Sequence, residues 1–186
     1  MDLQALKAIG QKIRVIVCDL DQTLLNSHKR ISSANLEAIR AAQAQGIFVT
    51  LCSGRIFTML ETYARELAID GPVISTNGAA IVNARDYILL AAHPMARDVA
   101  LSILDQALNR GYDTAALTEE ACYFSANSSR VERFQQYNRI AGEQGLKEIP
   151  ILPRADSREA VSPSVLKLLI QELQPGDLAH ATHMLQ

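Results

Sequence analysis

Two aspartates follow a short apolar segment near the start of the chain. Ile13 to Cys18 (IRVIVC) is apolar and rich in β-branched residues, and Asp19 and Asp21 come directly after it in the run DLDQT. Residues two apart in an extended segment point to the same side, so both carboxylates can face one cleft, where a divalent cation would offset their repulsion. Mg²⁺ suits such a place because it takes one or two carboxylates together with phosphate oxygens and water.

Hydroxyl groups and a glycine accompany the two aspartates. Thr23 lies in the same turn, and Ser53 and Gly54 follow a second apolar segment, IFVTLC. Phosphoryl transfer needs a nucleophile, a metal and donors aimed at the equatorial oxygens, and the backbone N–H groups around Gly54 add to these donors. A carboxylate nucleophile would form an aspartyl-phosphate, with Asp21 protonating the leaving oxygen and then activating water. Taken alone, Asp19 could instead have a structural role, because acidic residues also cap helices and close loops.

Three apolar segments alternate with amphipathic ones and would position these residues. The predicted strands are 13–18, 47–52 and 72–76, each apolar enough to be buried on both faces. Ser32 or Ser33 can cap a helix that runs to about Gln45, and a second helix carries an apolar stripe at Ile56, Leu60, Tyr63 and Leu67. This alternation predicts an α/β fold with a Rossmann-like parallel sheet, in which ligands bind beyond the carboxyl ends of the strands.

The pattern changes after the Asn77-Gly78 turn signal. The stretch 79–92 predicts a hairpin, and later segments predict helices at about 94–110 and 129–141 and strands near 113–117, 121–126 and 165–171. The first of these helices would bury Val99, Ile103 and Ala107. A short helix is expected at 2–9. We predict two domains, 1–92 with the Rossmann-like core and 93–186 as an inserted α+β domain.

Composition and charge narrow the classes of partner. The 186 residues carry a net charge of −2 with both signs interspersed, so neither nucleic acid nor a membrane is the expected partner. No apolar run approaches the roughly 20 residues that cross a bilayer, and we expect a cytoplasmic protein. The cysteines are an odd number at irregular spacing, which fits reduced core thiols better than a disulfide framework, and they lack the CxxC spacing of a structural zinc site; they are Cys18, Cys52 and Cys122.

Three motifs in order resemble the haloacid dehalogenase superfamily, and within it the Cof-like phosphatases with a large α/β cap. The matching runs are VIVCDLDQTLL from Val15, TLCSGR from Thr50 and ISTNGA from Ile74. The resemblance implies Asp19 as the nucleophile, Asp21 as the acid/base, and the Asp19 carboxylate with the Asp21 carbonyl as Mg²⁺ ligands. It also implies phosphate contacts from Thr23 and Ser53. Asn77 resembles the family turn that leads into the cap near the substrate, although a plain hairpin turn explains it equally well.

Two departures from the family pattern affect the expected activity. Gln22 stands where the family usually has Gly, at a loop position that a residue without Cβ fits easily. The later lysine and the last acidic pair of the family are not recognised. Lys167 alternates with the apolar Leu166, Leu168 and Ile170, and Gly176-Asp177 reads as a turn. We therefore expect the chain to end in or just after the cap, with an incomplete core that could pair with a second copy as a homodimer.

Three functions remain open at this point. The first is Mg²⁺-dependent hydrolysis of a small phosphomonoester, such as a sugar phosphate, through an aspartyl-phosphate. The second is a phosphate-binding or interaction module that does not turn over, because the later motifs are missing. The third is a phospho-acceptor signalling domain, which the DxDxT run and the large second domain disfavour.

Overall fold

The computed structural model describes residues 12–153 and 164–171. The chain divides into two compact units, Met1–Ala91 and Ala92–Gln186. The helix expected at 2–9 and the turn expected at Gly176-Asp177 lie outside the described residues. The assignment of 1–92 and 93–186 as core and cap stays a prediction.

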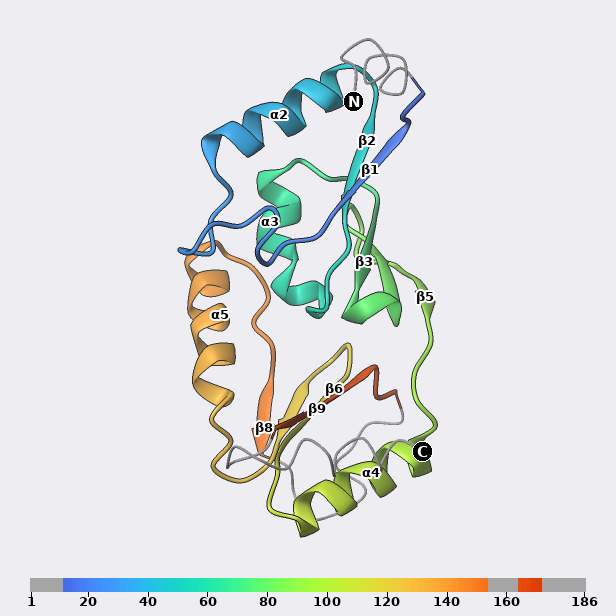
Figure 1. Ribbon diagram of the computed structural model, residues 1–186, viewed down its shortest axis with the longest axis vertical. Helices are drawn as coiled ribbons and strands as arrows, with labels where there is room; N and C mark the ends of the chain where they lie inside the picture. Colours follow the sequence, from blue (N-terminus) through green and yellow to red (C-terminus); the bar gives the residue numbers. More distant parts are fainter. Residues whose placement is uncertain (1–11, 154–163, 172–186) are drawn as a thin grey trace, which may run out of the picture. The chain divides into compact units, whose positions relative to one another are not determined.

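Parallel strands form the centre of the first unit. β1 (Val15–Cys18) and β2 (Phe48–Leu51) lie side by side and parallel, with Val15 opposite Phe48 (Figure 1). β3 (Pro72–Ser75) continues in the same direction through a bridge between Cys52 and Ile74. The three predicted strands are confirmed, and the carboxyl ends of β1 and β2 are tied by the Cys52 N–H, which donates to the Cys18 carbonyl at 2.9 Å.

Capping residues set the ends of the first connecting helix. α2 (Ser33–Ala44) is capped by the Ser32 hydroxyl, which accepts from the backbone N–H of Asn35, and Gly46 follows its end with a φ of 77°. The second predicted helix is instead a 3₁₀ turn, η1 (Phe57–Met59), followed by α3 (Glu61–Glu66). Its predicted apolar stripe is buried all the same.

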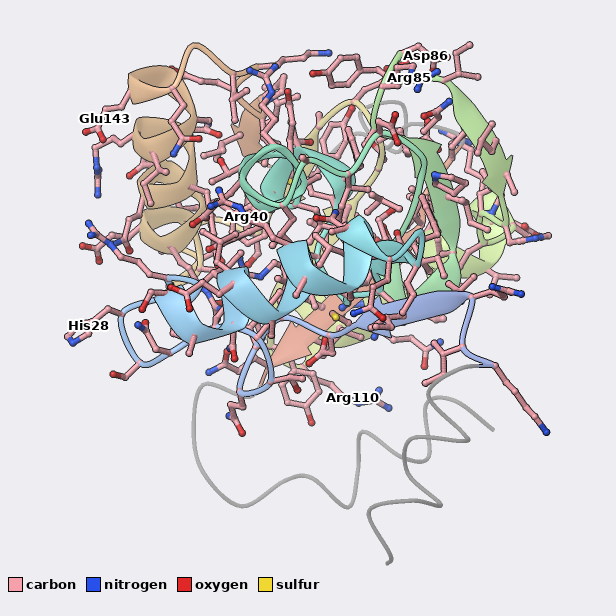
Figure 2. All side chains as sticks on the ribbon, turned by 90° about the horizontal axis from the view of Figure 1, so that it is seen from above. His28, Arg40, Arg85, Asp86, Arg110 and Glu143 are labelled. Atoms are coloured by element: carbon pink, nitrogen blue, oxygen red, sulfur yellow. The ribbon has the colours of Figure 1, made fainter. Side chains whose placement is uncertain are left out.

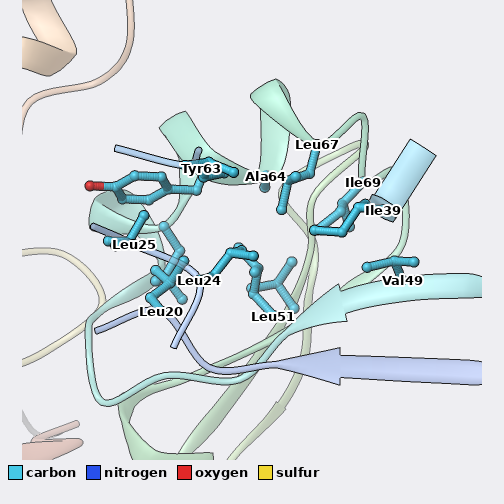
Figure 3. Close-up of a cluster of buried hydrophobic side chains, with 13 residues drawn as sticks. Leu20, Leu24, Leu25, Ile39, Val49, Leu51, Tyr63, Ala64, Leu67 and Ile69 are labelled. Atoms are coloured by element: carbon cyan, nitrogen blue, oxygen red, sulfur yellow. The ribbon is translucent and has the colours of Figure 1, made fainter. Parts of the chain in front are cut away.

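A cluster of apolar side chains joins α2 and α3 to one face of the strands (Figure 3). Leu51 and Leu60 are fully buried in it, and Ile16 and Cys18 of β1 pack against it. The opposite face of β1 differs from the prediction, because Val15 and Val17 are 52% and 51% exposed. No element in the described part of the chain covers that face. The prediction that this strand is buried on both faces was therefore wrong for the described residues.

The end of the first unit is a three-stranded sheet in the order β3-β4-β5. The predicted turn is the 3₁₀ helix η2 (Thr76–Gly78), and the predicted hairpin is β4 (Ala80–Asn83) with β5 (Leu89–Ala92). β3 and β4 are antiparallel. Thr76 and Asn77 have φ values of 55° and 60°, in the left-handed region that reverses the chain within so few residues.

The second unit has a four-stranded sheet in the order β8-β7-β6-β9. Its elements are α4 (Arg97–Asn109), β6 (Asp113–Leu117), β7 (Cys122–Phe124), α5 (Val131–Glu143), β8 (Ile151–Pro153) and β9 (Lys167–Gln171). β6 is buried along its whole length, between antiparallel β7 and β9. The sequence did not predict β8, which is a short edge strand.

Two predictions on this unit can be compared with its packing. Val99 was expected in the buried stripe of α4, but it is 49% exposed, and the buried residues of that helix are Ala100, Leu101, Leu104 and Ala107. Of the predicted stripe, Ala107 is buried and Ile103 is half-buried, so the prediction was wrong at Val99. Leu168 packs against the apolar cluster that α4 forms with β6, as its alternation with Lys167 predicted; the buried members are Ala100, Leu101, Leu104, Ala116 and Val165. Within the described residues, no helix is long and apolar enough for a membrane span.

Candidate active site

The turn after β1 is anchored by Leu20. This side chain is fully buried, and its carbonyl accepts from the backbone N–H groups of Thr23, Leu24 and Leu25 at 3.3, 3.1 and 2.9 Å. The turn leaves Asp19 exposed at the carboxyl end of the strand. The Thr23 hydroxyl donates to Asp19 Oδ2 at 3.3 Å, so two of the predicted site residues meet here.

Gln22 occupies a strained position in this turn. Its φ is 63°, in the left-handed region that a side chain with a Cβ disfavours. The residue fits the turn at an energetic cost that glycine would not have. This left-handed φ agrees with the expectation that a residue without Cβ fits this loop position more easily than Gln22 does.

The loops after β2 and β3 are joined by backbone hydrogen bonds. The Asn77 N–H donates to the Ser53 carbonyl at 3.0 Å, and the Thr76 N–H donates to the Arg55 carbonyl at 2.8 Å. The Ser53 side chain is buried, and its hydroxyl accepts from the Arg55 N–H at 3.4 Å. Gly54, the next residue along the chain, is half-buried, and Asn77 is exposed. The structure thus brings Ser53, Gly54 and Asn77 together.

Arg55 connects this group to the turn after β1. Its Nε and Nη2 donate to the two oxygens of Asp21 at 2.9 and 2.8 Å, in a bidentate ion pair. The Arg55 side chain is only 7% exposed, whereas that of Asp21 is 35% exposed. Such a fork matches both carboxylate oxygens and fixes the orientation of Asp21.

Two further residues complete a closed ring around Asp21. Lys29 Nζ donates to Asp21 Oδ1 at 2.6 Å. The Tyr63 hydroxyl accepts from Arg55 Nη1 at 3.4 Å and donates to the Lys29 carbonyl at 3.1 Å. The Arg55 guanidinium carbon also lies 5.4 Å from the centroid of the Tyr63 ring. We call these four residues, Asp21, Lys29, Arg55 and Tyr63, the Asp21 clamp.

The clamp sets the charge state of Asp21. The hydrogen bond from Arg55 is the largest cause that lowers the pKa of this carboxyl to about 2, with a smaller contribution from Lys29 and against the opposing effect of burial. Asp21 is therefore a carboxylate with both oxygens engaged at neutral pH. It can accept a proton only after these bonds loosen.

The donor set fits Mg²⁺ only in part. The exposed Asp19 carboxylate is available to a cation, but the Asp21 carboxylate is neutralised by Arg55 and Lys29 instead of sharing a cation with it. The described residues contain no group of three or more His, Cys, Asp or Glu side chains that could hold a metal. Mg²⁺ accepts one carboxylate with carbonyl, phosphate and water oxygens, so the Asp19 turn suits it as a partial site.

Three residues of the Asp21 clamp could not be recognised from sequence patterns. No sequence pattern predicts that Asp21 pairs with Arg55 and Lys29. Tyr63 was predicted only as a core residue. One signal was present, since Arg55 directly follows Ser53 and Gly54 at a strand end, where it can reach a neighbouring strand end.

A family model supports the grouping of these motifs. The model described as haloacid dehalogenase-like hydrolase matches residues 16–159. The 5-amino-6-(5-phospho-D-ribitylamino)uracil phosphatase YwtE of Bacillus subtilis (strain 168) is 33% identical over 108 residues, which cover 58% of this chain and 37% of that protein. The pyridoxal phosphate phosphatase YbhA of Escherichia coli (strain K12) is 32% identical over 92 residues, which cover 50% of this chain and 34% of that protein.

Solved structures support the fold. A haloacid dehalogenase-like hydrolase from Bacteroides thetaiotaomicron is similar with a TM-score of 0.69 and 26% identity, over 86% of this chain and 58% of that one. One from B. subtilis has a TM-score of 0.70 and 23% identity, over 92% and 66%. The chain spans well under half of either curated relative described above.

The clamp predicts a particular dependence of stability on pH. Since the folded pKa of Asp21, about 2, lies below its ordinary value of 3.8, the pair contributes stability above that ordinary value and loses it as pH falls through the folded pKa. We expect the parent to lose more of its free energy of unfolding than Asp21→Asn between about pH 5 and pH 2, measured by urea titration. The matched control Asp70→Asn, which removes an exposed ion pair with Arg85, should follow the parent. Parallel profiles for the parent and Asp21→Asn would contradict the clamp.

The strain at Gln22 predicts a stabilising substitution. Gln22→Gly should raise the free energy of unfolding by about 0.5 to 1 kcal/mol, because the relief of left-handed strain exceeds the entropy that glycine adds to the unfolded chain. Gln22→Ala keeps the Cβ and the strain, so it should give no such gain. Thermal unfolding of the three proteins measures the difference, and equal midpoints for the Gly and Ala variants would show that the position is unstrained.

Proposed function

The chain belongs to the haloacid dehalogenase-like hydrolases, and on this premise we propose that it hydrolyses a small phosphomonoester with Asp19 as the nucleophile. The observation that carries the proposal is the position of Asp19. Its carboxylate is exposed at the carboxyl end of a parallel strand and contacts the Thr23 hydroxyl. Ligand sites of open α/β sheets lie at this edge.

The reaction would proceed in two displacements. An Asp19 oxygen attacks phosphorus, the bond to the ester oxygen breaks, and an aspartyl-phosphate forms. Water then attacks the phosphorus and restores Asp19. Asp21 is the proposed proton carrier, giving a proton to the leaving oxygen and taking one from the water. Because Arg55 and Lys29 hold Asp21 ionised, its protonation requires the clamp to loosen first.

The remaining contacts would bind the phosphate. Thr23 and Ser53 contribute hydroxyls, and Gly54 and Asn77 lie in the loops joined to Ser53, where their polar groups can meet phosphate oxygens. Mg²⁺ would be held by the Asp19 carboxylate and the Asp21 carbonyl, and it would supply positive charge to a phosphate oxygen. The names of the two curated relatives suggest phosphorylated small metabolites as the substrate class.

A second candidate is a phosphate-binding module that does not turn over. Two observations favour it: the strained Gln22 in the nucleophile turn, and the engagement of both Asp21 oxygens in the clamp. The exposed Val15 and Val17 on β1 suit a homodimer in that case. Measuring phosphate release from an ester distinguishes this candidate, which would release none, from the phosphatase.

The decisive test is Mg²⁺-dependent release of phosphate from a generic aryl phosphate. Asp19→Asn should lower the rate at least about a thousandfold, since it removes the nucleophile while keeping the shape of the side chain. Asp70→Asn, an exposed aspartate of the same unit, should keep the parental rate. Equal rates for the parent and Asp19→Asn would reject the proposal.

A further inference from the structure

The loop from Asn26 to Arg30 is built to hold one conformation. The Asn26 side-chain carbonyl accepts from the backbone N–H groups of His28 and Arg30 at 2.9 and 3.1 Å. The backbone of Asn26 adds two bonds, donating to the Arg30 carbonyl at 2.9 Å and accepting from the Lys29 N–H at 3.0 Å. Local bonds of an asparagine side chain to the following backbone stabilise a turn of this kind.

Lys29 has an unusual backbone conformation within this loop. Its φ is 58°, which costs energy for a residue with a Cβ and persists only when its surroundings fix it. The bond from the Tyr63 hydroxyl to the Lys29 carbonyl is one such constraint. Figure 3 shows this hydroxyl at the border of the apolar cluster, pointing away from its other side chains. The neighbouring His28 points outward from the loop (Figure 2), whereas Lys29 reaches Asp21.

The two cations on Asp21 differ in how firmly they are held. Arg55 is 7% exposed and makes two bonds to the carboxylate. The Lys29 side chain is 51% exposed and makes one bond to it. An ammonium on a flexible, half-exposed stem exchanges partners at little cost, because exposed ion pairs contribute little and lysine does not need a fixed orientation. Lys29 is therefore the partner of Asp21 that can leave.

We propose that Lys29 is a substrate-binding residue, whose ammonium passes from the Asp21 carboxylate to the dianionic phosphate group of the substrate. This rests on the proposed function, because it requires a phosphate monoester at the Asp19 turn. A phosphate dianion attracts the ammonium more strongly than one carboxylate already paired with Arg55. The same exchange leaves Asp21 with Arg55 alone and loosens the clamp at the moment the substrate is bound.

Steady-state kinetics of Lys29→Gln test this inference in the full chain. The variant should raise KM for an aryl phosphate about tenfold while kcat stays within about threefold, as expected when a contact to a charged group is lost from ground state and transition state alike. Lys29→Arg should recover most of the affinity. The matched control Arg30→Gln removes the same charge from the next position of the loop and should leave KM unchanged.

Binding of inorganic phosphate, followed by ³¹P NMR, gives a readout that does not depend on turnover. The phosphate affinity of Lys29→Gln should fall by the same factor as its KM rises, and that of Arg30→Gln should equal the parent's. Parental affinity in Lys29→Gln, equal losses in both variants, or no phosphate binding by the parent would each overturn the inference. A parent that binds phosphate through Lys29 but releases none from the ester would reject the proposed function and leave the binding role of Lys29 supported.

Discussion

The ion pair between Arg55 and Asp21 is the interaction on which the arrangement of the site depends. It joins residues 34 positions apart in the chain and holds the turn after β1 against the loop after β2. The Arg55 carbonyl also accepts a hydrogen bond from the Thr76 N–H, in the loop after β3. Because the guanidinium is buried, loss of the Asp21 carboxylate would remove the acceptor of two of its hydrogen bonds, and this makes the three loops depend on one another.

Apolar packing supplies the rigid base for that pair. Leu20 is fully buried and holds the turn after β1 with its carbonyl. Tyr63 belongs to the same apolar cluster, and its hydroxyl reaches Arg55 and Lys29. The guanidinium of Arg55 and the hydroxyl of Tyr63 are thus carried by residues that are themselves buried. The exposed side of the site is left to Asp19, Thr23 and the Lys29 ammonium, which are the groups that a ligand would meet first.

Local sequence patterns predicted most of the elements but not the pairing of charges. The strands and α2 follow from apolar runs and from capping by Ser32, which act within a few residues. The pair of Asp21 with Arg55 depends on how two strand ends are placed in space, which periodicity does not contain. The exposure of Val15 and Val17 was missed for a similar reason, since an apolar run does not say whether anything covers its second face. The predicted stripe of α4 was right at Ala107 and one position off at Val99, where the neighbouring Ala100 is buried instead.

The central claim is that Asp19 carries the phosphoryl group. Reduction of an aspartyl-phosphate with borohydride during turnover converts the modified aspartate to homoserine, and peptide mass spectrometry locates it. The account predicts homoserine at position 19, and none at that position when the phosphate ester is omitted. Turnover of the ester with label at another residue, or with no trapped residue at all, would contradict it.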